Sequence, residues 1–161
     1  MDHFEPIVSP MTKRISLDKT AGAVYRAIDA LDASVDVDPA LRELVRLRAS
    51  QINRCSYCVD YHATDAKAAG QSDRRIAAVA AWRDNPLFDD RERAAFVLTD
   101  ALTDLPRNGV PDDVYAEAAR HFDDAELGNL IGAIISINAW NRVGVATGLV
   151  PELEAVLEAA G

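Results

Sequence analysis

The spacing of Cys55, Cys58 and His62 is the sequence feature that most constrains the fold of this chain. On a helix that begins near Ser56, successive residues turn by about 100°, and these three side chains fall within about 60° of one another. Cys58 and His62 are four residues apart, so they lie on adjacent turns. A neighbouring imidazole can accept the thiol proton and stabilise a thiolate. The pattern therefore predicts a helix here and makes Cys58 a candidate nucleophile.

Glu43 can join these side chains only if the chain reverses direction. Along one straight helix, the segment from Glu43 to Cys55 would rise about 18 Å, and its phase would be wrong by about 120°. Asn53 and Arg54 interrupt the apolar periodicity, and a turn there gives two antiparallel helices. Glu43 and His62 would then lie at nearly the same height, roughly 14 to 15 Å from the turn. A carboxylate, an imidazole and a thiol in this arrangement form a proton relay.

The rest of the chain predicts more helices. We find no alternating strand pattern of useful length and no Gly-rich phosphate loop. We therefore expect an all-α fold, a single-domain bundle of six to seven helices over residues 1–161, with residues 1–17 as an extended lead-in. Apolar periodicity and turn residues place the helices at about 18–33, 39–52, 56–69, 72–82, 90–102, 112–121 and 123–148.

Capping residues mark several of these helix starts. Asp38 precedes Pro39, Ser72 precedes the fourth helix, and Asp123 with Glu126 has the spacing of a capping box. The last helix is apolar around most of its circumference, which predicts burial against several neighbours or at a subunit interface.

Composition and charge exclude several classes of function. The chain has 49% hydrophobic and 27% charged residues, an ordinary globular balance. Its net charge of −9, with 17 scattered basic residues, argues against nucleic acid or an anionic membrane as partner. It lacks an apolar leader and a membrane span, so we expect a cytoplasmic protein. Two cysteines so close in sequence stabilise a fold poorly, and in a reducing compartment they are expected to cycle.

The glutamate, the two cysteines and the histidine within residues 43–62 resemble the active-site motif of alkylhydroperoxidase D-like (AhpD-like) proteins of the carboxymuconolactone decarboxylase superfamily. The segment INAWNRVGVATG, residues 137–148, is similar to the last helix of the same group. The founding member has a histidine directly before its second cysteine, where this chain has Tyr57. The resemblance implies a helical fold and assembly into trimers or hexamers.

Chemistry and resemblance together predict a thiol-dependent peroxidase. Cys58 would attack a hydroperoxide and become a sulfenic acid, which Cys55 would resolve as an intramolecular disulfide. Glu43 and His62 would move the proton. A helix N-terminus near Ser56 favours the reverse order of the two thiols, and this alternative stays open. The resemblance implies a dithiol reductant, such as a lipoyl-bearing protein, and we expect no bound cofactor.

Three other interpretations compete with the peroxidase. The superfamily includes decarboxylases acting on carboxymuconolactone, but these generally lack the cysteine pair. A non-enzymatic redox sensor or helical oligomerisation module would need only oxidisable thiols. The third interpretation is a zinc site, because four potential ligands are enough for tetrahedral coordination: Glu43, Cys55, Cys58 and His62. Structural zinc sites, however, usually take their ligands from two pairs that are far apart in the sequence. The resemblance also favours a pocket role for the polar residues of the last helix, which are Asn138, Asn141 and Arg142.

Overall fold

The computed structural model describes residues 14–152. In this part of the chain it contains eight α-helices, one 3₁₀-helix and no strand, so the all-α prediction is confirmed. The helices are α1 (Leu17–Thr20), α2 (Gly22–Ala33), α3 (Pro39–Asn53), α4 (Ser56–Ala68), α5 (Asp73–Ala78), η1 (Val79–Ala81), α6 (Asp90–Thr103), α7 (Asp112–His121) and α8 (Asp124–Thr147).

One break explains why the helix count exceeds the expected six to seven. The predicted first helix is divided at Ala21, whose backbone (φ −143°, ψ 54°) is not helical. Gly22 follows, and glycine has a low helix propensity, which makes a break inexpensive at this point. Of the expected lead-in, residues 1–13 lie outside the described residues, and Leu17 already begins α1.

The predicted caps are present. Oδ1 of Asp38 accepts the backbone N–H of Leu41 at 3.1 Å, and the side chain of Ser72 caps α5 in the same way. Asp123 and Glu126 form a complete capping box at the start of α8. Each cap satisfies backbone donors that a helix leaves unpaired, which typically contributes about 1 kcal/mol.

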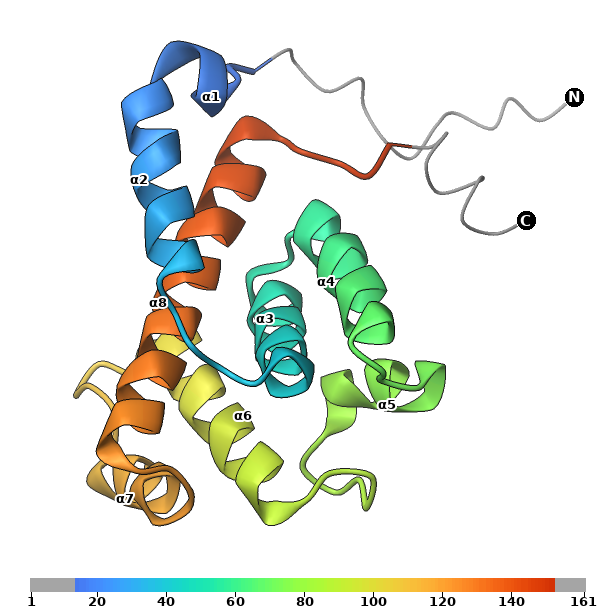
Figure 1. Ribbon diagram of the computed structural model, residues 1–161, viewed down its shortest axis with the longest axis vertical. Coiled ribbons are helices and arrows are strands. Elements are labelled where there is room, and N and C mark those ends of the chain that lie inside the picture. The colour runs from blue at the N-terminus through green and yellow to red at the C-terminus, as the bar shows by residue number, and fades with distance from the viewer. Residues whose placement is uncertain (1–13, 153–161) are drawn as a thin grey trace, which may run out of the picture.

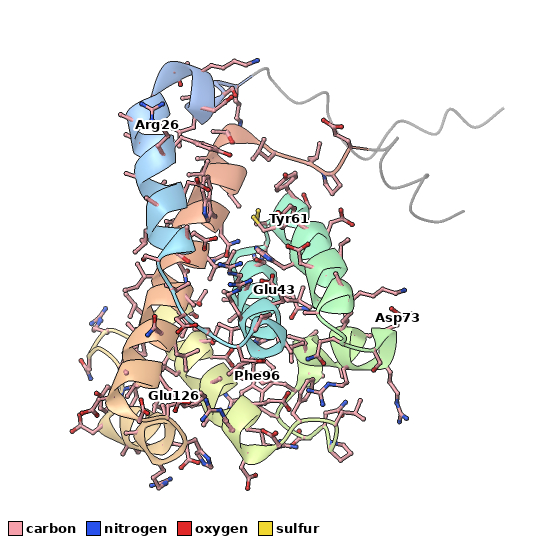
Figure 2. All side chains as sticks on the ribbon, in the orientation of Figure 1. Arg26, Glu43, Tyr61, Asp73, Phe96 and Glu126 are labelled. Carbon is pink, nitrogen blue, oxygen red and sulfur yellow. The ribbon has the colours of Figure 1, made fainter. Side chains whose placement is uncertain are left out.

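Helix α3 lies at the centre of the fold and packs against α4, α6 and α8 (Figure 1). It contributes Leu41 and Val45 to a core cluster shared with α6, α7 and α8. It also contributes Leu44 and Leu47 to a second cluster around Phe96 (Figure 2). Burying each such side chain stabilises the fold by about 1.5 to 3 kcal/mol. Because α3 is anchored in both clusters, the polar residues that it carries are held in fixed positions.

Helix α8 contacts α2, α3, α4, α6 and α7, as its apolar circumference predicts. Within residues 14–152, no helix combines the length and hydropathy needed to span a bilayer.

Apolar side chains on α2 and α8 remain exposed, which favours the expected homo-oligomer. Val24 and Leu31 of α2 are exposed, and Ile135 and Val145 of α8 are about half exposed. Helix α2 has no fully buried residue. We expect light scattering to give a mass more than about twice that of one chain. A monomer at micromolar concentration would contradict this prediction.

Candidate active site

The turn between α3 and α4 lies where the sequence predicts it. Arg54 adopts a left-handed backbone (φ 57°, ψ 36°) after the last residue of α3, and Cys55 caps α4. Nδ2 of Asn53 donates hydrogen bonds to Oδ1 of Asn138 and of Asn141 on α8, each at 2.9 Å. These bonds fasten the turn to α8 and therefore fix the beginning of α4, where the two thiols lie.

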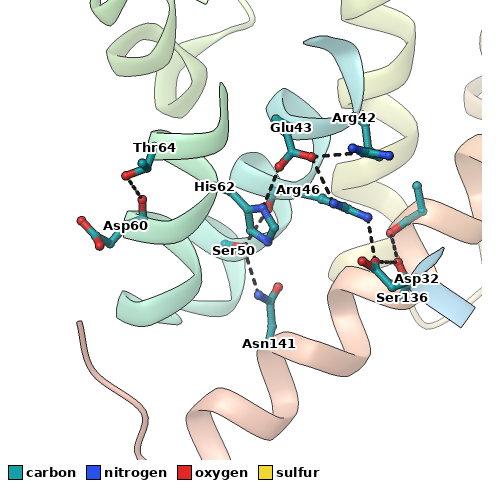
Figure 3. A network of polar contacts seen from close by, with 11 residues as sticks. Asp32, Arg42, Glu43, Arg46, Ser50, Asp60, His62, Thr64, Ser136 and Asn141 are labelled. Atoms are coloured by element: carbon teal, nitrogen blue, oxygen red, sulfur yellow. Dashed lines mark hydrogen bonds and ion pairs between the residues drawn. The ribbon is translucent and has the colours of Figure 1, made fainter. Parts of the chain in front are cut away.

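The antiparallel helices bring Glu43 and His62 into direct contact. Oε2 of Glu43 lies 2.8 Å from Nδ1 of His62 (Figure 3), and the two residues are 3% and 7% exposed. A carboxylate accepts the Nδ1 proton and so sets the tautomer, which leaves Nε2 of a neutral imidazole as an acceptor. That nitrogen has no hydrogen-bond partner among the described residues. The imidazole is therefore oriented to exchange a proton with a molecule beside it.

Two arginines hold the other oxygen of Glu43. Nη1 of Arg46 and Nε of Arg42 donate to Oε1 at 3.0 and 3.1 Å (Figure 3). Arg46 also donates to Oδ1 of Asp32 at 2.8 Å, and the same oxygen accepts the hydroxyl of Ser136 at 2.7 Å. This chain of polar contacts links α2, α3 and α8 around the carboxylate.

These contacts keep Glu43 ionised. Burial raises the pKa of its carboxyl group, but the hydrogen bond from His62 and the charge of Arg46 lower it by more, so the pKa is below its ordinary value. A buried glutamate is usually costly, and here three donors compensate the burial. Glu43 can therefore act as the anionic partner that orients the imidazole.

Cys55 and Cys58 are free thiols, both buried, at the N-terminus of α4. Sγ of Cys55 accepts the backbone N–H of Cys58 at 3.4 Å, as the cap of the helix. A hydrogen bond from the Cys58 thiol, assisted by backbone N–H groups, outweighs burial and lowers the pKa of Cys55 to about 7. The same interaction, together with burial, raises the pKa of Cys58. The interaction between the two thiols, together with the backbone N–H groups at the helix N-terminus, thus makes Cys55 the more acidic of the pair.

The predicted contact between His62 and the thiols is not direct. Among the described residues, no hydrogen bond joins His62 to either sulfur. The Cys58 thiol interacts instead with Cys55 and with Asn141 of α8, whose side chain lowers the pKa of Cys58. Asn141 is fully buried, and its Nδ2 donates to the hydroxyl of Ser50 at 2.9 Å (Figure 3). A water or a substrate has to bridge Cys58 and His62 for a proton to pass.

Gly144 of α8 packs directly against the dithiol, a role that the sequence did not reveal. A Cβ atom at this position would lie 2.8 Å from Sγ of Cys55 and 3.5 Å from Sγ of Cys58. Sulfur and carbon do not approach so closely, so the thiols leave room only for glycine.

We expect Gly144→Ala to lower the free energy of unfolding by about 1 to 3 kcal/mol, because overpacking displaces buried groups. Gly128→Ala is the matched control on the same helix, since its Cβ would have no neighbour within 4 Å. It should be neutral or stabilising by up to about 1 kcal/mol. Urea unfolding of both variants tests this, and equal stability would show that the thiols yield to a methyl group.

Aromatic side chains surround a cavity of about 450 Å³ next to the dithiol. The Tyr25 and Trp140 rings meet edge to face at 4.9 Å, and the Tyr57 and Tyr61 rings stack at 6.0 Å (Tyr61 is labelled in Figure 2). Cys58 lines the cavity between them. These four aromatic side chains therefore form part of the cavity wall, and the volume suits a small organic molecule.

The side chains that could hold a metal ion differ from those considered for zinc. Potential ligand atoms of Glu43, His62 and Asp65 lie within 4.8 Å of one another, and neither cysteine belongs to this group. Glu43 is already held by two arginines, which compete with a cation for its oxygens.

Comparison with known proteins places the chain in its class. The family model described as "Carboxymuconolactone decarboxylase family" matches residues 21–101. The uncharacterized protein YdfG of Bacillus subtilis (strain 168) is 35% identical over 112 residues, 70% of this chain and 76% of YdfG. A protein of unknown function from Agrobacterium tumefaciens, ATU0492, proposed to be the antioxidant defence protein AhpD, is 33% identical with a TM-score of 0.83, over 88% of this chain and 99% of that one.

A more distant structure shares the fold. The alkylhydroperoxidase AhpD core of a peroxidase-related protein from Ralstonia eutropha JMP134 is 19% identical, with a TM-score of 0.75 over 87% of this chain and 76% of its own.

Fold and site together define a helical protein with a dithiol at a helix N-terminus and a buried glutamate–histidine pair beside it. The chain belongs to the carboxymuconolactone decarboxylase family and is AhpD-like. The relatives support a function that is peroxidase-related or of the carboxymuconolactone decarboxylase type.

Proposed function

We propose that this protein is a thiol-dependent peroxidase that reduces hydroperoxides through a Cys55–Cys58 dithiol/disulfide cycle. The observation that carries the proposal is the buried Glu43–His62 pair, 2.8 Å apart, in the wall of the cavity that Cys58 also lines. The name given to the Agrobacterium relative, which refers to antioxidant defence, supports the same class of activity.

Cys58 is the proposed nucleophile because it faces the cavity. Cys55 is 2% exposed and is not among the described residues that line the cavity. The lower pKa of Cys55 favours the opposite order of the two thiols. In the proposed order the Cys55 thiolate acts as the base that accepts the Cys58 proton, which leaves Cys58 as the attacking sulfur. Cys58 is therefore the sulfur that attacks the peroxide, and Cys55 is the base that receives its proton.

The cycle balances in two steps. When Cys55 ionises, its proton passes to Nε2 of His62. The Cys58 sulfur then attacks the terminal oxygen of the hydroperoxide, the O–O bond breaks and the Cys58 proton passes to Cys55. The alkoxide takes the proton held at Nε2 of His62 and leaves as an alcohol. Cys55 then attacks the sulfur of the sulfenic acid, forms the disulfide and releases water. The peroxide gains two electrons and the thiol pair loses two. An external dithiol, such as a protein-bound lipoyl group, restores both thiols by exchange.

The direct test is steady-state reduction of hydroperoxides with a panel of dithiols, and it should give turnover. A companion experiment treats the protein with stoichiometric peroxide and no reductant. The intact mass of the protein should fall by two hydrogen atoms, and neither thiol should remain alkylatable. Oxidation without turnover by any dithiol would favour the redox-sensor alternative. Two thiols that still alkylate after peroxide treatment would exclude the cycle and leave the lyase alternative.

A further inference from the structure

The cavity beside Cys58 carries more negative than positive charge. Its described lining includes four carboxylates and two guanidinium groups. Arg42 and Arg46 are bound by Glu43 and Asp32, so these charges compensate one another. The other two carboxylates, those of Asp29 and Asp65, form no ion pair with any described residue. They leave the cavity with about two uncompensated negative charges.

Asp65 lies close to the proposed chemistry. It is one turn after His62 on α4, and its carboxylate is within 4.8 Å of potential ligand atoms of Glu43 and His62. Its charge is also the largest cause of the raised pKa of Tyr61, which lies on the neighbouring turn. A molecule that reaches Cys58 and the imidazole therefore enters the field of Asp65.

The walls favour an uncharged body. Tyr25 and Trp140 on one pair of helices and Tyr57 and Tyr61 on α4 present ring surfaces, and Val143 and Leu149 add apolar area. Both cavity arginines pair with Glu43, and Arg46 also pairs with Asp32, so their positive charges are already compensated within the protein. Aromatic walls with uncompensated carboxylates bind neutral or cationic apolar molecules and repel anions.

We propose that this cavity selects neutral hydroperoxides with an apolar or aromatic body and discriminates against those that carry a carboxylate, and that Asp65 and Asp29 determine this specificity. The proposal rests on the peroxidase function proposed above and names its substrate class. Like charges several ångströms apart at a partly buried site repel enough to change binding by on the order of ten- to a hundredfold. The repulsion between exposed charges falls as salt is added.

The first test compares cumene hydroperoxide with the same compound bearing a para-carboxylate. Rates are normalised to the reaction of each peroxide with free dithiothreitol. We expect kcat/KM to favour the neutral compound by about tenfold or more. The attacking thiolate also repels anions, so the preference by itself does not identify the aspartates as its cause. The following variants make that assignment. Asp65→Asn should reduce the preference severalfold, Asp29→Asn should reduce it less, and Asp112→Asn on α7 should leave it unchanged. A preference that Asp65→Asn does not alter would overturn the proposal.

A second test needs no peroxidase activity. The thiols of the folded protein react with neutral iodoacetamide and with anionic iodoacetate, and the ratio of the two rates is compared with that of the protein in urea. We expect folding to raise the ratio about tenfold and Asp65→Asn to reverse much of that rise. If no peroxide turnover is found but the ratio of the iodoacetamide rate to the iodoacetate rate depends on Asp65, the peroxidase function is rejected and charge selection is supported. Equal ratios in folded and unfolded protein would overturn charge selection even where turnover is observed.

Discussion

Cys58→Ser is expected to reduce peroxide turnover by on the order of 10³-fold or more, because it removes the sulfur that faces the cavity. Serine is close to cysteine in shape, and its hydroxyl can donate a hydrogen bond toward Cys55 as the thiol does. The change therefore tests chemistry more than packing. Cys55→Ser is the matched partner. It should also stop steady-state turnover, but it should allow one round of oxidation that ends at a sulfenic acid on Cys58. Single-turnover peroxide consumption and trapping with dimedone distinguish the two variants.

The opposite pattern would assign the nucleophile to Cys55. The structure gives this alternative a physical basis, because the helix cap and the Cys58 thiol lower the pKa of Cys55 to about 7. A trapped sulfenic acid in Cys58→Ser, and none in Cys55→Ser, would mean that acidity outweighs access to the cavity. In that case the rate of single oxidation should be half maximal near pH 7 and fall at lower pH, since the thiolate is the reactive form. The dithiol cycle would stand with its roles exchanged.

Local rules were enough to predict the pairing of Glu43 with His62. The rise of a helix and the position of one turn place both residues at the same height, and the structure joins them at 2.8 Å. The helix caps at Asp38, Ser72 and Asp123 could also be predicted from the sequence, because a capping residue interacts with neighbours only three positions away.

The supporting contacts could not be predicted in the same way. Ser136 meets Asp32 across 104 positions, and Asn141 meets Ser50 across 91. Such contacts depend on how whole helices pack, which periodicity does not specify. Gly144 is the clearest case, because its size is set by two sulfur atoms on another helix. The sequence identified Asn141 as a pocket candidate only through the family resemblance.

His62→Ala is expected to lower kcat/KM for hydroperoxides by about 10² to 10⁴-fold, the range for a residue that transfers a proton. Glu43→Gln should have a smaller effect, because Glu43 acts through the imidazole that it orients. Unfolding curves must accompany both variants, since Glu43 also pairs with two arginines. Asp100→Asn is the control, because it removes a partly buried ion pair with Arg48 outside the cavity. It should cost stability and leave turnover unchanged.

The double variant separates positioning from an independent role. If Glu43 works only by orienting His62, Glu43→Gln should cost no further activity once His62 is alanine, and the two effects should be strongly non-additive. Additive losses in kcat/KM would mean that Glu43 reaches the reaction by another route, such as Arg46 or the field in the cavity. A variant of His62 with full turnover would remove the imidazole from the mechanism. Proton transfer would then depend on Cys55 and Cys58 alone, whose thiols interact and shift each other's pKa in opposite directions.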